Sequence, residues 1–330
     1  MVCSSWNTGI TIAIPCSSST MVNSTNKEID GFSKNSSSSS KTSNRVILLG
    51  ANGFLGRNLA SELVSPPKEL SNLLVYDREN EKLTGYRKNI KMKSVQFDEI
   101  SSEPSSDIVV VNCMSARRPS HTIRIEEANY SRPASIVEKI RNLGLQKVFW
   151  LQPESYWQYA VSESPDDDYV YWKQVFSKYL REQSQQDLLH VIPLVLCHLI
   201  GANDDANRFI PRLVRSLRTE SEVEIINPNE TLYLSDVDDV SYFLSTSIKE
   251  NSLKQNKGTQ IFPFQRVTIR KLIDLILEVV PERPKVRFIN HPKQLAPRIS
   301  EHMYSLPVVD SNRITPLQLT LKKVSDKLKP

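Results

Sequence analysis

Glycine is scarce in this chain of 330 residues, which contains only nine, yet Gly50, Gly53 and Gly56 fall within seven consecutive positions. They follow a short apolar run at 45–49 and precede apolar residues with helical spacing at 54–64. In a strand, glycine turn and helix in this order, backbone N–H groups at the helix N-terminus can contact a pyrophosphate with no Cβ in the way. An ordinary turn does not explain so local a concentration of glycine, and the cluster therefore predicts dinucleotide binding.

A carboxylate stands at the expected distance from this turn. Asp77 ends the next apolar run, 21 residues beyond Gly56. A carboxylate there accepts hydrogen bonds from both hydroxyls of the adenosine ribose and repels a 2′-phosphate, which favours NAD over NADP. Arg78, which comes directly after it, leaves NADP open. The predicted cofactor contacts in these two segments are Gly50, Asn52, Gly53, Phe54, Leu55, Gly56, Asp77 and Arg78.

Short apolar runs alternate with helical patterns along the chain after residue 44. Strands are expected at 45–49, 73–76, 94–97, 108–112, 147–151 and 190–199, and helices at 54–64, 125–143 and 169–182. This alternation predicts an α/β fold with a doubly wound parallel sheet of the Rossmann type. After Gly201 the elements become shorter, so we expect a NAD(P)-binding domain over 45–200 and a smaller substrate-binding lobe over 201–330.

The first 44 residues have a different composition. They contain 13 Ser and 5 Thr but only two acidic residues. Such a segment cannot bury enough apolar area to offset its ordering entropy, and a disordered tail is expected. Because it is rich in Ser and Thr, a plastid transit peptide is the alternative, although the segment contains no Arg; a cytoplasmic location is the default.

Composition excludes several classes of protein. The longest mostly apolar stretch, 188–202, is interrupted by two His and one Pro, so no membrane span is expected. The four Cys and five His show no metal-ligand spacing, and no metal site is predicted. The 42 basic and 37 acidic residues are interspersed, which suits an anionic small ligand and does not indicate nucleic acid.

A tyrosine and a lysine form the candidate catalytic pair. Among the 11 tyrosines only Tyr169 has a lysine four residues later, Lys173, and the pair opens the helix expected at 169–182. At this spacing both side chains lie on one helical face. A neighbouring ammonium stabilises the phenolate and lowers the pKa of a tyrosine, which allows the hydroxyl to exchange a proton near neutral pH. The alternative is an amphipathic helix with a partly buried Tyr and a solvated Lys.

Together, the Gly-x-x-Gly-x-x-Gly spacing and the Tyr-x-x-x-Lys pair resemble the extended short-chain dehydrogenase/reductases, in their sugar-nucleotide epimerase/dehydratase branch. The resemblance covers residues 45 to about 320. It implies that Asp98 contacts adenine, that Lys173 also holds the nicotinamide ribose, and that the substrate is a nucleotide sugar. It further implies a homodimer formed through the helices expected at 125–143 and 169–182.

The chain departs from this family at the end of the fifth strand. Gln152 stands where the family has a catalytic Ser or Thr, so either its amide or the hydroxyl of Ser155 is expected to polarise the substrate. Only Glu154 remains of the Thr-Asp-Glu of the 4,6-dehydratases, which disfavours dehydration. The 17 residues from Gln152 to Tyr169 are similar to the interval in deoxysugar 4-ketoreductases such as CDP-abequose synthase.

Substrate-binding residues are expected after Gly201. The segment 207–211, Asn-Arg-Phe-Ile-Pro, is similar to the one with which the family contacts the nucleotide, and it implies Asn207, Arg208 and Arg215 as substrate contacts. Arginines recur at 208, 212, 215 and 218, where one or two can bind a diphosphate or all can form a solvated face. The family's Val-Asp-Asp-Val is present at 237–240, but Thr231 or Leu232 replaces its preceding Arg.

These observations predict an NAD(P)-dependent sugar-nucleotide oxidoreductase or epimerase. Because the catalytic Ser/Thr and the diphosphate-binding Arg are missing, the alternative is a cofactor-binding sensor or scaffold without turnover.

Overall fold

The computed structural model describes residues 45–65, 73–76, 93–94, 107–117, 124–142, 148–161, 167–186, 189–252, 258–290 and 298–328. The Ser/Thr-rich segment of residues 1–44 lies outside these ranges. So do three predicted cofactor contacts, Asp77, Arg78 and Asp98. What the sequence indicates for these positions therefore stays a prediction.

Seven parallel strands form the main sheet, in the order β11-β7-β5-β4-β1-β2-β3. They are β1 (Arg45–Leu49), β2 (Leu73–Tyr76), β3 (Lys93–Ser94), β4 (Ile108–Asn112), β5 (Val148–Ser155), β7 (His190–Leu196) and β11 (Gln260–Ile261). From β1 the chain adds β2 and β3 on one side and then β4, β5 and β7 on the other, so the strand order reverses between β1 and β4. Open α/β sheets bind ligands at the carboxyl ends of the strands at such a point. The predicted Rossmann-type sheet is confirmed.

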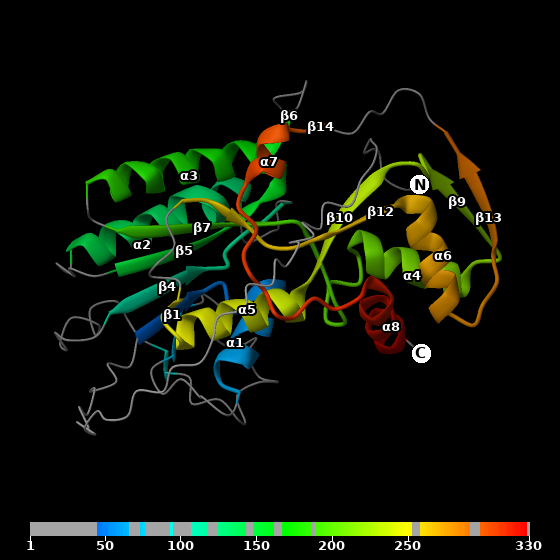
Figure 1. Cartoon of the computed structure of the whole chain (residues 1–330), viewed down its shortest axis with the longest axis horizontal. Helices are drawn as coiled ribbons and strands as arrows, with labels where there is room; N and C mark the ends of the chain where they lie inside the picture. The colour runs from blue at the N-terminus through cyan, green and yellow to red at the C-terminus, as the bar shows by residue number, and fades with distance from the viewer. Residues whose placement is uncertain are drawn as a thin grey trace, which may run out of the picture.

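Helices cover both faces of this sheet (Figure 1). On one face, α1 (Phe54–Leu63) and α5 (Val237–Lys249) share a hydrophobic core with Val46 and Leu48 of β1. On the other, α2 (Arg132–Asn142) and α3 (Asp168–Gln185) share a core with Ile47 and Leu49. Successive strand residues point to opposite faces, so a strand buried on both sides is a continuous apolar run.

A smaller part lies beside the carboxyl ends of the main sheet (Figure 1). It contains a three-stranded sheet of β8 (His198–Ile200), β10 (Thr231–Asp236) and β12 (Gln265–Thr268), and a pair of parallel strands, β9 (Glu222–Ile226) and β13 (Lys285–Ile289). Helices α4 (Phe209–Thr219), α6 (Ile269–Val279) and α8 (Leu317–Lys327) share its hydrophobic core. Thr268 caps α6, because its hydroxyl accepts a hydrogen bond from Lys271 N at 3.2 Å.

The remaining short elements connect the two parts. They are η4 (Tyr156–Tyr159), β6 (Ala160–Val161), β14 (Arg298–Ile299) and α7 (Glu301–Ser305), with β14 antiparallel to β6. Both α5 and β11 follow residue 200, yet β11 belongs to the main sheet and α5 packs with α1 on one face of that sheet. The ammonium of Lys249, at the end of α5, donates to the Glu62 carbonyl of α1 at 2.8 Å. The two parts are therefore interleaved along the chain.

Several elements differ from their predicted bounds, such as α3, which extends beyond the predicted end at 182 to Gln185, and three differences are larger. The helix expected at 125–143 contains a π-helical stretch, η3 (Glu127–Ser131), before α2. The strand expected to end at 151 continues to Ser155. The strand expected at 190–199 is two strands, because the chain leaves the main sheet after β7 and enters the three-stranded sheet as β8.

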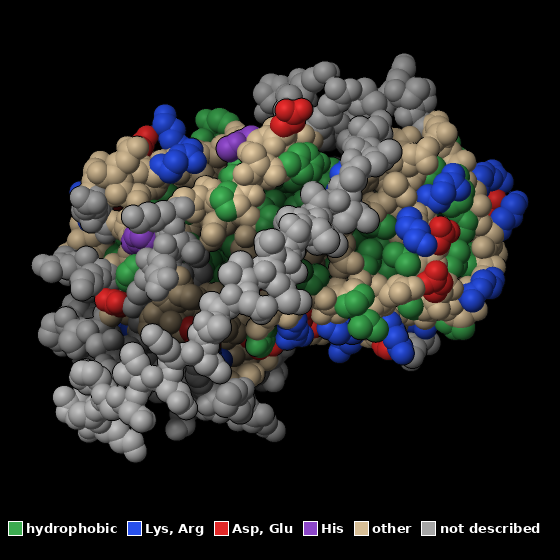
Figure 2. All heavy atoms as spheres, viewed as in Figure 1, with side chains coloured by type: hydrophobic (Ala, Val, Ile, Leu, Met, Phe, Trp, Pro, Cys, Tyr) green, Lys and Arg blue, Asp and Glu red, His purple; other side chains and the backbone are tan. Residues whose placement is uncertain are grey.

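Charges line the outer edge of the smaller part. Glu222 of β9 pairs with Lys285 at 3.2 Å and with Arg287 at 2.8 Å, and Glu224 pairs with Arg287 at 3.2 Å. Figure 2 shows basic and acidic side chains close together at this end of the molecule. These pairs are exposed, so each contributes little to stability. Within the described ranges, no helix is long and apolar enough to span a membrane.

Asp236 and the Val-Asp-Asp-Val segment that follows it connect the start of α5 to the C-terminal part of the chain. Asp236 caps α5 by accepting from Asp238 N at 2.7 Å, and it also accepts from the hydroxyl of Thr320 in α8. Asp239 accepts from the Thr315 hydroxyl at 2.8 Å. Burial raises the pKa of Asp236, and the Thr320 hydrogen bond opposes that rise. A buried carboxylate therefore depends on a donor from the far end of the chain.

We expect Thr320→Val to lower the free energy of unfolding by about 1–3 kcal/mol, because it leaves Asp236 buried without that donor. Urea denaturation at pH 7.5 measures the change. Thr219→Val is the control, since the exposed Thr219 hydroxyl donates only to the Arg215 carbonyl of its own helix, at 3.1 Å. Equal losses in the two variants would contradict this role of Thr320.

Candidate functional site

The glycine turn occupies the carboxyl end of β1. Gly50 has φ of +71°, and a Cβ there would lie 2.8 Å from the backbone of Cys113 and Met114. A Cβ on Gly56 would lie 2.1 Å from the Gly50 carbonyl oxygen. Both positions therefore require glycine, the first for its conformation and its close approach to β4, the second because α1 packs directly on the turn.

The turn leaves the N-terminus of α1 open to an anion. Gly53 is the N-cap, it donates to the Gly50 carbonyl at 3.0 Å, and no side chain caps the helix. The first turn of α1 contains no acidic residue. A helix N-terminus without a capping oxygen or a carboxylate presents N–H groups and a positive dipole, so these residues fit a dinucleotide pyrophosphate.

Tyr169 and Lys173 lie on the first turns of α3. Asp167 caps the helix and accepts from Tyr169 N at 3.0 Å. Tyr169 is partly buried and Lys173 is 5% exposed. Burial raises the pKa of Cys113 to about 12, and the positive charge of Lys173 opposes that rise, so the ammonium lies close to Cys113. The structure thus brings Lys173 to the strand end against which Gly50 packs.

Gln152 is held inside the protein at the carboxyl end of β5. Its side chain is 1% exposed, and its Oε1 accepts from Asn112 Nδ2 and from Trp150 Nε1, each at 3.0 Å. Its Nε2 donates to the Pro153 carbonyl at 3.0 Å. The amide therefore joins β4 to β5 through contacts within the protein.

Ser155 and Glu154 follow on the same strand. The Ser155 Oγ accepts from Trp157 N at 3.3 Å, and its N–H donates to Gln158 Oε1 at 2.8 Å. Glu154 is buried and accepts from the Tyr159 hydroxyl at 2.8 Å. Gln158 also donates to Ser177 Oγ of α3 at 3.0 Å. Ser155 is thus a partly exposed hydroxyl at the strand end, fixed relative to the helix that carries Tyr169.

Phe54, directly after Gly53, contacts two arginines. The guanidinium of Arg57 lies 5.7 Å and that of Arg208 lies 5.4 Å from the centre of its ring. Arg208 also donates to Asp204 at 2.8 Å. The predicted substrate residue Arg208 therefore lies against the glycine turn, where it connects the cofactor side to the start of α4.

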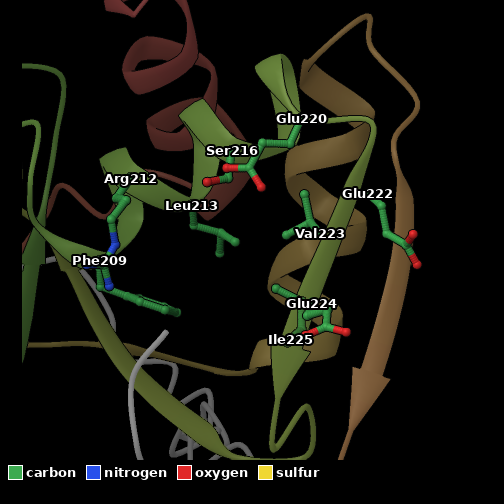
Figure 3. Close-up of a pocket in the computed structure, with 9 residues that line it drawn as sticks. All are labelled: Phe209, Arg212, Leu213, Ser216, Glu220, Glu222, Val223, Glu224 and Ile225. Atoms are coloured by element: carbon green, nitrogen blue, oxygen red, sulfur yellow. The ribbon is translucent and has the colours of Figure 1, made fainter. Parts of the chain in front are cut away.

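A cavity of about 400 Å³ lies between α4 and β9. Figure 3 shows Phe209 and Leu213 of α4 directed toward β9, whereas Glu222 turns away toward β13. Arg212, Ser216, Glu220, Val223, Glu224 and Ile225 complete the lining. The cavity offers an aromatic ring and apolar side chains with charged groups around them, which is typical of small-molecule sites.

The other predicted substrate residues lie outside this lining. The backbone N–H of Asn207 donates to Asp205 at 2.8 Å, and Arg215 donates to the Ala206 carbonyl at 2.9 Å. Arg218 is buried between helices and donates to the Ser325 carbonyl at 2.8 Å. Of the four regularly spaced arginines, Arg212 lines the cavity. The spacing alone could not distinguish them, because it does not indicate which protein group each arginine contacts: Arg208 and Arg215 bind to the loop before α4, whereas Arg218 binds to Ser325 far along the chain.

Sequence reasoning missed His198 and Arg117. Burial and the positive charges of Arg208 and Arg117 lower the pKa of His198 to about 3. The guanidinium of Arg117 lies 4.9 Å from the centre of the Trp157 ring. No motif contains these residues, which come from the loop after β4 and from β8, and their neighbours belong to η4 and to the start of α4.

We expect Gly56→Ala to weaken NADH binding at least 100-fold, because the new Cβ would displace the turn that receives the pyrophosphate. Fluorescence titration with NADH measures the dissociation constant. Gly258→Ala is the control: Gly258 has φ of +90°, but a Cβ there would have no described atom within 4 Å, so only backbone strain is introduced. Unchanged NADH affinity in Gly56→Ala would contradict this position for the cofactor.

We also expect His198 to make the protein less stable in acid. In the unfolded chain a histidine binds a proton below its ordinary pKa of about 6.5, whereas folded His198 stays neutral down to about 3. The unfolded state binds more protons between these values, so the free energy of unfolding falls as pH falls. His198→Gln should remove about 2 kcal/mol of the difference between pH 7.5 and pH 5, measured by urea denaturation. The control, exposed His190→Gln, should retain that difference; retention in His198→Gln as well would contradict the prediction.

The fold matches solved structures at low sequence identity. One match is UDP-glucuronic acid 4-epimerase from Bacillus cereus in complex with NAD, at 14% identity. The superposition covers 86% of this chain and 98% of the epimerase chain, with a TM-score of 0.65. DesIV, a dTDP-glucose 4,6-dehydratase from Streptomyces venezuelae with NAD bound, matches at 14% identity, coverage of 86% and 96%, and a TM-score of 0.61. RMD from Pseudomonas aeruginosa, complexed with NADPH, matches at 12% identity, coverage of 86% and 98%, and a TM-score of 0.62.

A comparison with curated proteins gives no match. Residues 46–257, which are well over half of the chain, match the sequence model of the NAD dependent epimerase/dehydratase family. This range includes the glycine turn, β5 and the Tyr169–Lys173 pair. The predicted family and its nicotinamide cofactor are thereby confirmed, and the chain belongs to the NAD dependent epimerase/dehydratase family.

Proposed function

We propose that this protein is an NAD(P)-dependent oxidoreductase or epimerase that acts on a sugar nucleotide. The observation that carries the proposal is the position of Lys173, which is buried on α3 and whose charge acts on Cys113 at the strand end that packs against the glycine turn. Tyr169 lies one helical turn before it, on the same face of α3. A proton-exchanging tyrosine and a lysine close to the cofactor site are the groups that hydride chemistry at a carbinol carbon needs.

The nicotinamide, when bound, accepts or donates a hydride at a sugar carbon. Tyr169 exchanges the proton of the reacting hydroxyl at its own Oη. The Lys173 ammonium stabilises the phenolate by charge and binds the nicotinamide ribose hydroxyls. Gly50, Gly53 and Gly56 hold the pyrophosphate through the N-terminus of α1.

Ser155 is the better candidate for the polarising hydroxyl. The Gln152 amide is already bonded to Asn112, Trp150 and Pro153, whereas Ser155 is partly exposed and its Oγ accepts only from Trp157 N among the described residues. A hydroxyl hydrogen that rotates freely can donate to a substrate oxygen. Gln152 then positions the ends of β4 and β5 and does not touch substrate.

The cavity between α4 and β9 suits the nucleotide. Phe209 offers a ring for base stacking, and Arg212 offers a guanidinium for phosphate or base oxygens. The complexes of the B. cereus epimerase and of DesIV contain UDP- and TYD-type ligands, which supports a nucleoside diphosphate sugar as the substrate class. Reduction of a 4-keto-6-deoxy sugar is the specific reaction we propose first, because of the short interval from Gln152 to Tyr169. The homodimer and the cellular location stay predictions.

A second candidate is a cofactor-binding protein without turnover. It is favoured by the internal hydrogen bonds of Gln152 and by the replacement of a diphosphate-binding Arg by Thr231 or Leu232, both of which are buried. It predicts tight NAD(H) binding and no hydride transfer with any sugar nucleotide.

We expect Tyr169→Phe to lower kcat about 100- to 10,000-fold, because the variant cannot exchange the proton, and to change the NADH dissociation constant less than threefold. The assay follows NADH and NADPH oxidation with a 4-keto-6-deoxy sugar nucleotide; net oxidation identifies a reductase, whereas an epimerase regenerates its cofactor. Tyr171→Phe, an exposed tyrosine of the same helix, is the matched control. Full turnover in Tyr169→Phe would contradict the mechanism, and wild-type NADH binding with no turnover across a panel would favour the second candidate.

A further inference from the structure

Gln158 connects the end of β5 to the helix that carries Tyr169. It belongs to η4, three residues after Ser155, and it is partly buried. Its Oε1 accepts from Ser155 N at 2.8 Å, and its Nε2 donates to Ser177 Oγ of α3 at 3.0 Å. One amide therefore joins the strand end that carries the candidate polarising hydroxyl to the helix that carries the candidate proton donor.

The bond to Ser155 lies where the main sheet becomes incomplete. β4 pairs with β5 only as far as Leu151, whereas β7 pairs with β5 as far as Ser155. Within the described ranges, the last residues of β5 therefore have a partner strand on one side only. There the side chain of Gln158, rather than a strand carbonyl, accepts the Ser155 N–H. The backbone of Ser155 is thus held by a residue that is itself bonded to α3.

The bond to Ser177 reaches the side of α3 that carries the Tyr-Lys pair. Ser177 follows Lys173 by four residues and Tyr169 by eight, so the three lie along one side of the helix. Lys173 and Ser177 are each 5% exposed, which places that side inside the protein. Gln174, on the exposed side, donates to the Gln158 carbonyl at 3.0 Å. Two residues of α3 therefore hold Gln158 close to the Tyr-Lys pair.

A second glutamine nearby does not connect these two elements. The side chain of Gln152 is bonded to Asn112, Trp150 and Pro153, all of which belong to β4 or β5. Gln152 therefore holds strand to strand, whereas Gln158 holds strand to helix.

We propose that Gln158 is a positioning residue, which sets the distance between the hydroxyls of Ser155 and Tyr169 at the reacting oxygen of the sugar. This inference rests on the proposed function, in which both hydroxyls serve that oxygen. The two groups come from β5 and α3, and a displacement of about 1 Å between reacting groups can lower a rate about 100-fold. Gln158 acts through Ser155 and α3, and it contacts neither substrate nor cofactor.

The first test separates turnover from binding in the full chain. NADH and NADPH oxidation is followed with 4-keto-6-deoxyhexoses linked to dTDP, CDP and GDP. We expect Gln158→Leu to lower kcat about 10- to 100-fold, while the KM for the sugar nucleotide and the dissociation constant of NADH stay within threefold. Gln158→Glu should keep kcat within threefold, because one carboxylate oxygen can accept from Ser155 N and the other from the Ser177 hydroxyl.

A double-mutant cycle distinguishes positioning from a general structural role. If Gln158 acts through Ser155, its loss cannot lower kcat further once that hydroxyl is absent. Ser155→Ala combined with Gln158→Leu should therefore have the kcat of the slower single variant, within threefold, whereas independent effects would multiply. The control, Gln318→Leu, removes an exposed glutamine that connects α8 to Glu278 of α6, and it should leave kcat unchanged.

Ser177→Ala provides the same test if Gln158→Leu does not fold. It keeps the bond from Ser155 N to Gln158 and removes the one to α3, so kcat should fall at least fivefold with unchanged KM.

Wild-type kcat in Gln158→Leu, or in Ser177→Ala, would overturn the inference and leave the proposed function standing. Multiplication of the two effects in the double variant would also overturn it, as would an equal loss of kcat in Gln158→Leu and Gln158→Glu. Absence of turnover by the wild type with all three substrates and both cofactors would count against the proposed function itself and would remove the inference with it.

Discussion

The close approach of Gly56 to the Gly50 carbonyl is the contact on which the rest of the molecule depends. It allows α1 to begin directly on the turn after β1, with its N-terminal N–H groups directed to the place where β1 and β4 separate. Cys113 holds the other side of the turn, since its N–H donates to the Leu49 carbonyl at 3.0 Å. Any side chain at either glycine would separate the helix from the strand end, and the phosphate site would be lost before any catalytic group is affected.

The same turn also connects the cofactor side to the substrate side. Both Arg57 and Arg208 have their guanidinium groups near the Phe54 ring, and a Cβ on Gly201 would lie 3.4 Å from that ring. Arg208 is the N-cap of α4, whose next residue lines the cavity. The glycine turn and the start of α4 are therefore in contact through the Phe54 ring.

Much of this arrangement was predictable from the sequence, because local pattern and glycine chemistry determine it. The main strands are runs buried on both faces, and Thr268 is a helix cap by its type and position. The extension of β5 was not predictable, since Pro153 lacks the N–H that an interior strand needs. It is tolerated because β4 pairs with β5 only as far as Leu151, and Pro153 pairs with β7 alone.

The break between β7 and β8 has a similar explanation. A continuous apolar run is compatible with burial in one sheet or in two, and only the tertiary contacts of β8 with β10 distinguish them. The π-helical stretch before α2 contains buried Asn129, which donates to the carbonyl of Ala116 in the preceding loop and to that of Ile125 one turn earlier, each at 2.7 Å. The pairing of β8 is set by a partner strand far away in the sequence, which a local pattern does not contain.

The arginines show how far residue type and spacing can indicate function. Arg208, Arg215 and Arg218 have the spacing of a phosphate-binding helix face, yet each is bonded to a carbonyl or a carboxylate of the protein. Arg117 belongs to no motif, and its nearest described carboxylate lies 4.0 Å away. A guanidinium already bonded within the protein must lose those bonds before it can bind a ligand, whereas a stacked and weakly paired one loses little. The partners of each arginine, rather than its position on a helix, therefore decide which of them can recognise a substrate.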